Sequence, residues 1–254
     1  MKRTGLKDRL RRGDVVANAW LTIPSAFAAE VAAHTGVDAV TIDRQHAPID
    51  VASMVAMLQA VTHAPAVPLV RVGSHDPADA MQALDAGAMG VICPLIDTPE
   101  QAEAFVRACR YPPRGGRSWG PTRAKFAHDG YDPDVADDEV LTFAMIETPR
   151  GLENLDAIVR TEGLDGVFVG PVDLSLNLTG RPVVDLEAGP LVDALQDVIG
   201  ACATHGRIPG GFAGSGDDAA RMRALGFRFV TVGADAAHAT RGFEAAVRTL
   251  RAGG

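Results

Sequence analysis

Short apolar runs rich in β-branched residues alternate along the chain with amphipathic helical patterns. The helical patterns, such as Pro24–Thr35 and Val51–Ala64, often open with Pro, Ser or Asp, which favour helix starts. Eight strand-and-helix repeats predict a (β/α)8 TIM barrel, expected as one domain over residues 1–254. The predicted strands are Val15–Ile23, Ala39–Asp43, Val67–Val72, Gly90–Pro94, Leu141–Ile146, Gly166–Gly170, Ile208–Gly211 and Phe229–Val232.

A doubly wound open sheet is the alternative, because the same alternation builds it. That fold usually has a Gly-rich first turn, and none follows Val15–Ile23. The one long interruption is Arg110–Glu139, which is rich in Pro, Gly, Arg and Asp. A loop of this length is usually functional or forms a subunit contact.

Composition and net charge limit the kinds of binding partner that the chain is expected to have. Hydrophobic residues make up 47% of the chain and aromatic residues 5%, with Ala and Val predominating, which suits helices packed closely on short parallel strands. The net charge of −8 and the scarcity of lysine argue against a nucleic-acid partner and favour a small molecule. The basic start, Met1–Arg12, has no apolar signal core after it, and no apolar run reaches membrane-spanning length, so we expect a cytoplasmic protein without a membrane partner.

The cysteines are odd in number and widely spaced in apolar surroundings. This pattern indicates neither a disulfide framework nor a thiolate metal cluster. We predict that all three are buried packing residues: Cys93, Cys109 and Cys202.

Two carboxylates follow neighbouring predicted strands. Glu147 ends the fifth strand and Asp173 follows the sixth. In a barrel the reacting groups gather at the carboxyl ends of the strands, so these side chains would face one point. Two oxygen ligands with open positions are typical of Mg²⁺ or Mn²⁺ rather than of a closed zinc site. The alternative is that each acid merely caps the helix after it.

The turn from the sixth strand into its helix is a candidate carboxylate site. The segment Gly170-Pro171-Val172-Asp173 leaves the N–H groups of Val172 and Asp173 unpaired at a helix start. Gly170 would let a ligand approach the backbone closely, although an ordinary tight turn explains a glycine equally well.

Three further strand-end residues carry chemistry. Arg71 ends a buried strand and needs an anionic or polar partner; it would hold a C2 carbonyl or enolate oxygen, or form a structural ion pair with another strand end. His46 follows Asp43 by three residues, so that carboxylate would orient the imidazole as a general base. Trp20, at the end of the first strand, would line the pocket or belong to the core.

Lysine is absent from every predicted strand, since only Lys2, Lys7 and Lys125 occur. A Schiff-base aldolase needs a desolvated strand lysine. Any carbon–carbon cleavage would therefore use a metal and a cation as its electron sink.

Read together, these segments resemble the HpcH/HpaI aldolases, the metal-dependent pyruvate aldolases. The resemblance spans nearly the whole chain. It rests on six segments: Ile42-Asp43 through His46-Ala47-Pro48, Val70-Arg71, Ala83-Leu84-Asp85-Ala86-Gly87-Ala88, Arg110-Tyr111-Pro112-Pro113, Ile146-Glu147-Thr148 and Val169-Gly170-Pro171-Val172-Asp173-Leu174-Ser175.

The resemblance implies a barrel of the phosphoenolpyruvate/pyruvate type that cleaves a 4-hydroxy-2-oxo acid to pyruvate, or hydroxypyruvate, and an aldehyde. Glu147 and Asp173 would hold Mg²⁺ or Mn²⁺, with Co²⁺ as a further option, and the 2-oxo acid would chelate it. Arg71 would contact the keto oxygen and His46 would act as the base. Asp85 would come from a neighbouring subunit of a homo-oligomer, expected to be a hexamer, with the C-terminal helix in its contacts.

Two departures and two rival functions bear on this expectation. Relatives often have Gly-Glu where this chain has Arg44-Gln45, and Gln where it has Met145, which cannot donate a hydrogen bond. The pH optimum and the substrate preference are therefore open. One rival is a CoA-thioester lyase of the citrate lyase or malyl-CoA type; the end of the chain after Ala237–Arg251 disfavours it, because such lyases usually carry added length. The other is a non-catalytic metabolite-binding barrel.

Overall fold

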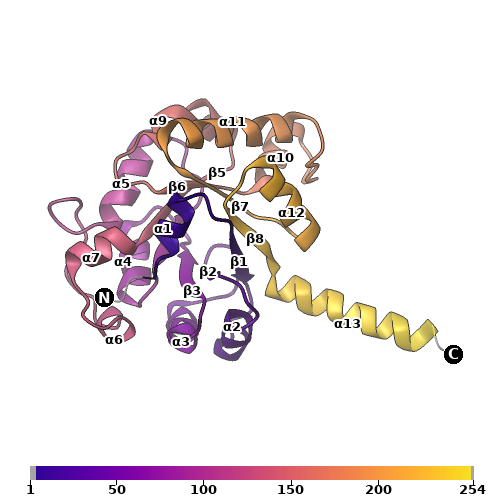
Figure 1. Cartoon of the computed structure of the whole chain (residues 1–254), viewed down its shortest axis with the longest axis horizontal. Coiled ribbons are helices and arrows are strands. Elements are labelled where there is room, and N and C mark those ends of the chain that lie inside the picture. The colour runs from indigo at the N-terminus through magenta and orange to yellow at the C-terminus, as the bar shows by residue number, and fades with distance from the viewer. Residues whose placement is uncertain (1–3, 253–254) are drawn as a thin grey trace.

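The computed structural model describes residues 4–252, and its strands form a closed barrel. All eight neighbouring pairs are parallel, and the first strand pairs with the last, so the sheet has no edge (Figure 1). This confirms the TIM barrel and excludes the open sheet. The strands are β1 Val16–Leu21, β2 Ala39–Asp43, β3 Val67–Arg71, β4 Gly90–Cys93, β5 Leu141–Ile146, β6 Gly166–Val169, β7 Ile208–Gly211 and β8 Phe229–Ala234.

Helices surround the barrel, and side chains cap many of their starts. Thr98, for example, forms a reciprocal capping box with Gln101, and Asp50 accepts the N–H of Ser53. The helices are α1 Leu6–Arg11, α2 Ala26–Ala33, α3 Val51–Val61, α4 Pro77–Asp85, α5 Pro99–Cys109, α6 Ala124–Ala127, α7 Pro133–Glu139, α8 Pro149–Glu153, α9 Leu155–Val159, α10 Pro171–Thr179, α11 Pro190–His205, α12 Gly216–Leu225 and α13 Asp235–Ala252.

The apolar core has two layers, one between strands and helices and one inside the barrel. Phe143, Phe168 and Phe229 fill the interior, with the rings of Phe143 and Phe229 stacked at 5.0 Å. Gly166 makes room for them, because a Cβ there would lie 2.6 Å from the Phe143 ring. The packing explains why so few aromatic residues suffice.

Helix α1 closes the amino end of the barrel. Leu6 and Leu10 are buried in the same cluster as the barrel interior. The sequence patterns did not predict this helix, because six residues are too few for a 3.6-residue period to stand out from a basic stretch.

Two predicted segments were wrong in detail. The sequence pattern predicts one helix, Gly151–Val159, between Glu147 and the sixth strand. The structure has two helices there, because Asn154 leaves helical geometry and its Nδ2 donates to the carbonyl of Asp97 at 2.7 Å. The long loop Arg110–Glu139 contains two short helices, α6 and α7, the second capped by Asp132.

The three cysteines are free and buried, as predicted. Within residues 4–252, no helix combines the length and apolar character needed to cross a membrane. Helix α13 buries none of its residues and extends away from the barrel (Figure 1).

Candidate active site

A cavity of about 370 Å³ opens at the carboxyl ends of the strands. Most of the predicted site residues line it, while Glu147 lies behind Gly170 and Asp85 lies elsewhere. The lining consists of Trp20, Thr22, Asp43, His46, Arg71, Met145, Phe168, Gly170, Pro171, Val172, Asp173, Phe212 and Ala234.

Arg71 is held by a bidentate ion pair. Its Nε and Nη2 donate to the two oxygens of Asp43 at 2.9 and 2.6 Å, and the guanidinium lies 4.8 Å from the centre of the Trp20 ring. Trp20 in turn donates its indole N–H to Asp43 at 3.2 Å. Arg71 therefore forms the ion pair that was the alternative prediction and also lines the cavity. Among residues 4–252, its Nη1 has no hydrogen-bond acceptor, so this nitrogen remains for a ligand.

The carboxylate of Asp43 binds the side chain of Arg71 and also accepts hydrogen bonds from backbone N–H groups. Burial would raise the pKa of its carboxyl, but the hydrogen bonds and charge of Arg71, with the N–H groups of Gln45 and Trp20, hold the pKa below its usual range. Asp43 accepts the backbone N–H of His46 at 3.4 Å. No hydrogen bond joins Asp43 to the His46 ring in the described part of the chain, and the exposed ring is not oriented in the predicted way.

Glu147 is 2% exposed and has one backbone donor, the N–H of Leu95 at 2.9 Å. Leu95 has a φ of 54°, in the left-handed region that non-glycine residues rarely adopt. Burial, together with the nearby charge of Asp173 and against the opposing Leu95 hydrogen bond, raises the pKa of Glu147 to about 7. The positive charge around Glu147 is therefore too small to offset the cost of burying its carboxylate.

Glycine is required at position 170 by the lack of space for a side chain, not by the backbone conformation of the turn. Its φ of −92° is open to any residue, whereas a Cβ would lie 2.6 Å from Oε2 of Glu147 and 3.2 Å from Cε of Met145. A larger residue would displace the glutamate. Gly170 therefore brings Glu147 close to the first turn of α10, which carries Asp173.

Asn177 is a site residue that sequence reasoning missed. Its Nδ2 donates to the carbonyls of both Glu147 and Asp173, each at 3.0 Å. It joins the end of β5 to the start of α10. Its position four residues after Asp173 on one helix face was the only available signal.

The donor set fits a divalent cation. A buried carboxylate with a raised pKa lies near a second carboxylate, and a cation between them would remove the unfavourable charge. Within residues 4–252, no group of three His, Cys, Asp or Glu side chains is placed to hold a metal. Two protein oxygen ligands would leave positions for water and substrate, the pattern that Mg²⁺ favours.

Asp85 ends α4 and does not line its own chain's cavity. Its Oδ1 accepts from Nη2 of Arg117 at 2.7 Å, and that guanidinium lies 4.5 Å from the centre of the Tyr111 ring. Within one chain, Asp85 and His46 are not brought together.

The residues that differ from the family pattern, Met145 and the pair Arg44-Gln45, lie next to the site. Met145 is buried and presents an apolar side chain to the cavity. Buried polar atoms without hydrogen-bond partners occur on Arg44, at Nε and Nη1, and on Gln45, at Oε1. Arg44 still lies 3.7 Å from Asp79.

Comparison with known proteins agrees with the geometry. Residues 17–241 match the family model described as HpcH/HpaI aldolase/citrate lyase, and the chain belongs to this family. It is 42% identical over 218 residues to a hydroxypyruvate/pyruvate aldolase of Rhizorhabdus wittichii, covering 86% of this chain and 87% of the relative. It is 36% identical to a 4-hydroxy-2-oxo-heptane-1,7-dioate aldolase of Klebsiella pneumoniae, covering 94% and 91%.

A solved structure has the same architecture. It is a HpcH/HpaI aldolase/citrate lyase family protein from Burkholderia cenocepacia, with a TM-score of 0.90 and 33% identity over 98% of this chain and 99% of the other.

Proposed function

We propose that this protein is a divalent-metal-dependent aldolase that cleaves a 4-hydroxy-2-oxo acid to pyruvate, or hydroxypyruvate, and an aldehyde. The observation that carries the proposal is that Asp173 and Arg71 line the cavity at the carboxyl ends of the strands, with the buried Glu147 carboxylate next to Gly170 in the same wall. The aldolase names of relatives 34–42% identical over most of the chain support it.

Glu147 and Asp173 would hold the metal, either Mg²⁺ or Mn²⁺, with Co²⁺ as a further option. The bound cation supplies positive charge against the negative charge that develops on the oxo acid. The N–H groups of Val172 and Asp173 at the start of α10 would receive the substrate carboxylate, because a helix N-terminus favours an anion.

The remaining steps belong to the side chains of the cavity. Arg71 donates Nη1 to the keto oxygen, where negative charge accumulates as the C3–C4 bond breaks. His46 removes the proton of the C4 hydroxyl, and the C4–oxygen bond becomes the carbonyl of the aldehyde. The electrons of the broken C3–C4 bond form the enolate of pyruvate. Protonation at C3 then gives pyruvate. Trp20 and Asp43 position Arg71 for this task.

The active enzyme is proposed to be a homo-oligomer, a hexamer in our expectation, in which Asp85 approaches His46 of a neighbouring subunit. Helix α13 supports this proposal, because Phe243 and Leu250 are 76% and 80% exposed on a helix that buries nothing in its own chain. A second copy would cover this apolar face. A cytoplasmic location stays a prediction.

Exchange of the C3 protons of pyruvate in D₂O tests the proposal without knowledge of the aldehyde. We expect exchange with added Mn²⁺ or Mg²⁺, its loss with EDTA, and a large loss in Glu147→Gln with the metal at equal concentration. Exchange no faster than in a protein-free control, with either metal, would favour a non-catalytic barrel, and protein-dependent exchange that EDTA leaves unchanged would contradict the metal requirement. Turnover that requires a CoA thioester would favour the lyase alternative.

A further inference from the structure

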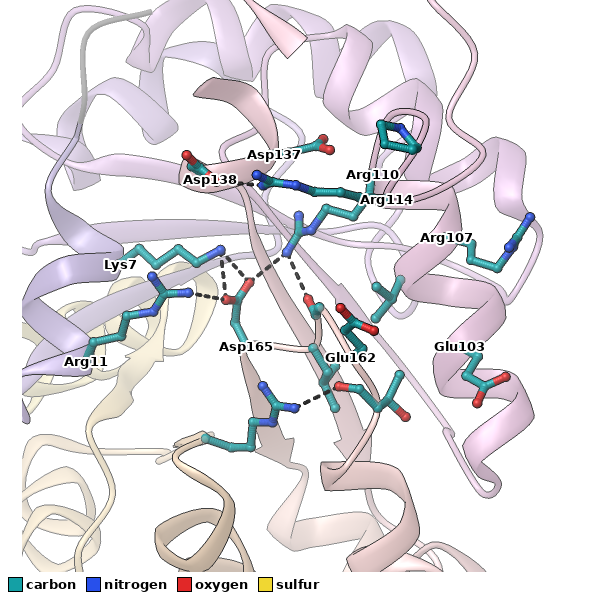
Figure 2. Close-up of a pocket in the computed structure, with 16 residues that line it drawn as sticks. Lys7, Arg11, Glu103, Arg107, Arg110, Arg114, Asp137, Asp138, Glu162 and Asp165 are labelled. Atoms are coloured by element: carbon teal, nitrogen blue, oxygen red, sulfur yellow. Dashed lines mark hydrogen bonds and ion pairs between the residues drawn. The ribbon is translucent and has the colours of Figure 1, made fainter. Parts of the chain in front are cut away.

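A second cavity, of about 750 Å³, lies at the opposite end of the barrel, and Figure 2 shows the residues that line it. Its residues belong to α1, α5, the loop after α5, α7 and the segments that precede β6 and β7, so it opens at the amino ends of the strands. The proposed chemistry uses none of them. Charged residues dominate its lining: Lys7, Arg11, Glu103, Arg107, Arg110, Arg114, Asp137, Asp138, Glu162, Asp165 and Arg207.

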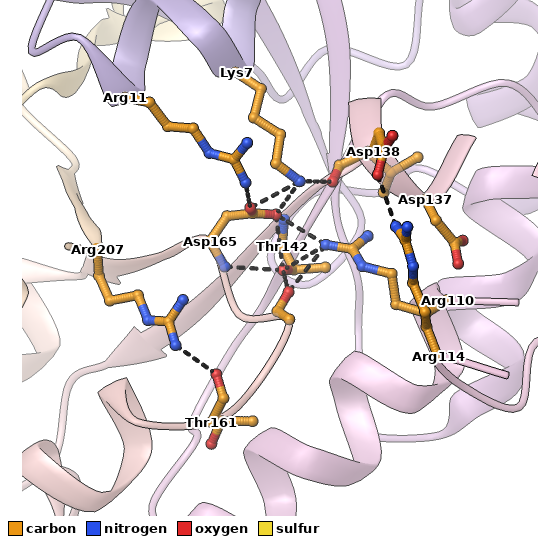
Figure 3. Close-up of polar contacts among 12 residues, drawn as sticks. Lys7, Arg11, Arg110, Arg114, Asp137, Asp138, Thr142, Thr161, Asp165 and Arg207 are labelled. Carbon is orange, nitrogen blue, oxygen red and sulfur yellow. Dashed lines mark hydrogen bonds and ion pairs between the residues drawn. The ribbon is translucent and has the colours of Figure 1, made fainter. Parts of the chain in front are cut away.

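Three cations converge on one carboxylate in this cavity (Figure 3). Lys7 lies 2.8 Å from Oδ1 of Asp165, Arg110 donates to Oδ2 at 2.9 Å, and Arg11 lies 3.5 Å from Oδ1. Three positive charges and one negative charge leave an excess of two positive charges in this cluster. Asp165 also accepts the N–H and hydroxyl of Thr142, so its oxygens have no capacity for a further cation.

Arg110 carries an unsatisfied donor. The residue is 4% exposed, and its Nη2 donates to Asp165, to the carbonyl of Gly163 at 3.0 Å and to Thr142 at 3.3 Å. Its Nη1 is buried without an acceptor. A buried guanidinium N–H without an acceptor is costly, so the missing partner is an anion oxygen or another acceptor. Burial and the charge of Arg110 also lower the pKa of Lys7 to about 8, against the opposing attraction of Asp165.

The other acids around the cavity have partners or lie at its open side. Asp137 accepts the backbone N–H of Tyr111 at 3.0 Å, and Asp138 forms an ion pair with Arg114 at 2.7 Å. Glu103 and Glu162 are exposed. The backbone N–H does not cancel the negative charge of Asp137, so the positive excess is confined to the group formed by Lys7, Arg11 and Arg110 around Asp165.

We infer that this cavity binds a small dianion, which accepts a hydrogen bond from Nη1 of Arg110 and lies beside the cations Lys7 and Arg11. A phosphate monoester and a dicarboxylate both have this charge and the required acceptor oxygens. The cavity volume exceeds that of a bare phosphate, so a small metabolite bearing the charged group fits. The bound anion ties α1 to the bases of β5 and β6.

Isothermal titration of the full chain tests the inference, with inorganic phosphate, glycerol 3-phosphate and succinate as probes at fixed ionic strength and pH 7. We expect saturable binding of one dianion per chain. Saturating pyruvate with Mg²⁺ fills the cavity at the carboxyl ends and should leave this binding intact. Tighter binding of the phosphates or of succinate identifies the source of the dianion.

Arg11→Gln is the first variant, because that side chain is 58% exposed and its loss should be tolerated by the fold. We expect the affinity for the dianion to fall on the order of tenfold. Arg12→Gln is the matched control: it removes an exposed arginine next in sequence that does not line the cavity, and should leave the affinity unchanged.

Arg110→Lys keeps the charge but removes Nη1, and should weaken binding at least as much as Arg11→Gln, with circular dichroism used to verify the fold. The inference is overturned if none of the three probes binds saturably, or if pyruvate with Mg²⁺ abolishes binding. It is also overturned if Arg11→Gln and Arg12→Gln bind equally well.

Discussion

The cavity at the carboxyl ends of the strands and the cavity at their amino ends bury charges of opposite sign. At the carboxyl ends, burial and Asp173 raise the pKa of Glu147 to about 7. At the amino ends, burial and Arg110 lower the pKa of Lys7 to about 8. Each pKa shift favours the neutral form of a buried group whose charge is only partly offset by opposite charges and hydrogen bonds around it. The comparison indicates a missing cation at one end and a missing anion at the other.

The largest expected effect is on stability at the amino ends. Asp165→Asn should lower the free energy of unfolding by about 3–5 kcal/mol, because it leaves Lys7 and Arg110 buried without their carboxylate. Urea denaturation measures this change. The control Asp14→Asn removes an exposed acid that pairs with Arg9 and Arg12, and should cost less than about 1 kcal/mol. Similar losses in both variants would show that the buried cations are not dependent on Asp165.

At the carboxyl ends, Arg71→Ala should reduce metal-dependent pyruvate exchange by about 10²–10³-fold, or roughly 3–4 kcal/mol, through loss of the donor to the developing oxyanion. Arg71→Lys keeps the charge opposite Asp43 and should recover part of the activity. A thermal melt of each variant separates activity from folding, since Asp43 loses its ion pair in the alanine variant. Near wild-type exchange in a folded Arg71→Ala protein would contradict the assigned role.

The pH dependence of the stability of the metal-free protein tests the direction of the pKa shift of Glu147. Its folded pKa of about 7 exceeds the ordinary value of 4.5, so ionisation opposes folding. The destabilisation is absent below pH 4.5, grows as pH rises, and reaches about 3 kcal/mol above pH 7.

Urea denaturation of the wild type and of Glu147→Gln from pH 5 to 8 isolates this contribution, because the glutamine does not titrate. The wild type should lose stability relative to the variant as pH rises, and Mn²⁺ should restore it. A difference that stays constant over this range would show that the glutamate is compensated without a metal.

A smaller effect is expected from Gly170→Ala, whose Cβ would displace the Glu147 carboxylate. Loss of this orientation should weaken Mn²⁺ binding by about 10–100-fold in a titration. Gly200→Ala is the control, because nothing lies within 4 Å of a Cβ there and alanine favours the helix. Equal metal affinity in both variants would remove Gly170 from the proposed site.

Patterns with a local cause were predicted from the sequence. Buried parallel strands produce short apolar runs, and the predicted bounds of β2 and β5 match the observed ones; those of β7 match as well, although its sequence, Ile-Pro-Gly-Gly, is not such a run. The strand ends then placed Arg71 and Asp173 on one cavity without any structure. The break at Asn154 was missed because it depends on the carbonyl of Asp97, 57 residues away.

The partners of charged residues could not be predicted for the same reason. Asp43 lies three residues from His46 but binds the side chain of Arg71, 28 residues away, because the adjacent strands β2 and β3 place them side by side. The cluster around Asp165 joins segments up to 158 residues apart. Spacing along the chain carries no information on such pairs until the fold is known.

Helix α1 has a consequence for synthesis of the protein. Lys7 is made early, but its partners, the carbonyl of Val140 and the carboxylate of Asp165, follow 133 and 158 residues later. Barrel closure likewise waits for β8 to reach β1. Contacts of such long sequence separation form late, because the loop they close costs entropy first. In a nascent chain, Leu6 and Leu10 therefore remain without their final packing until these later segments have been made.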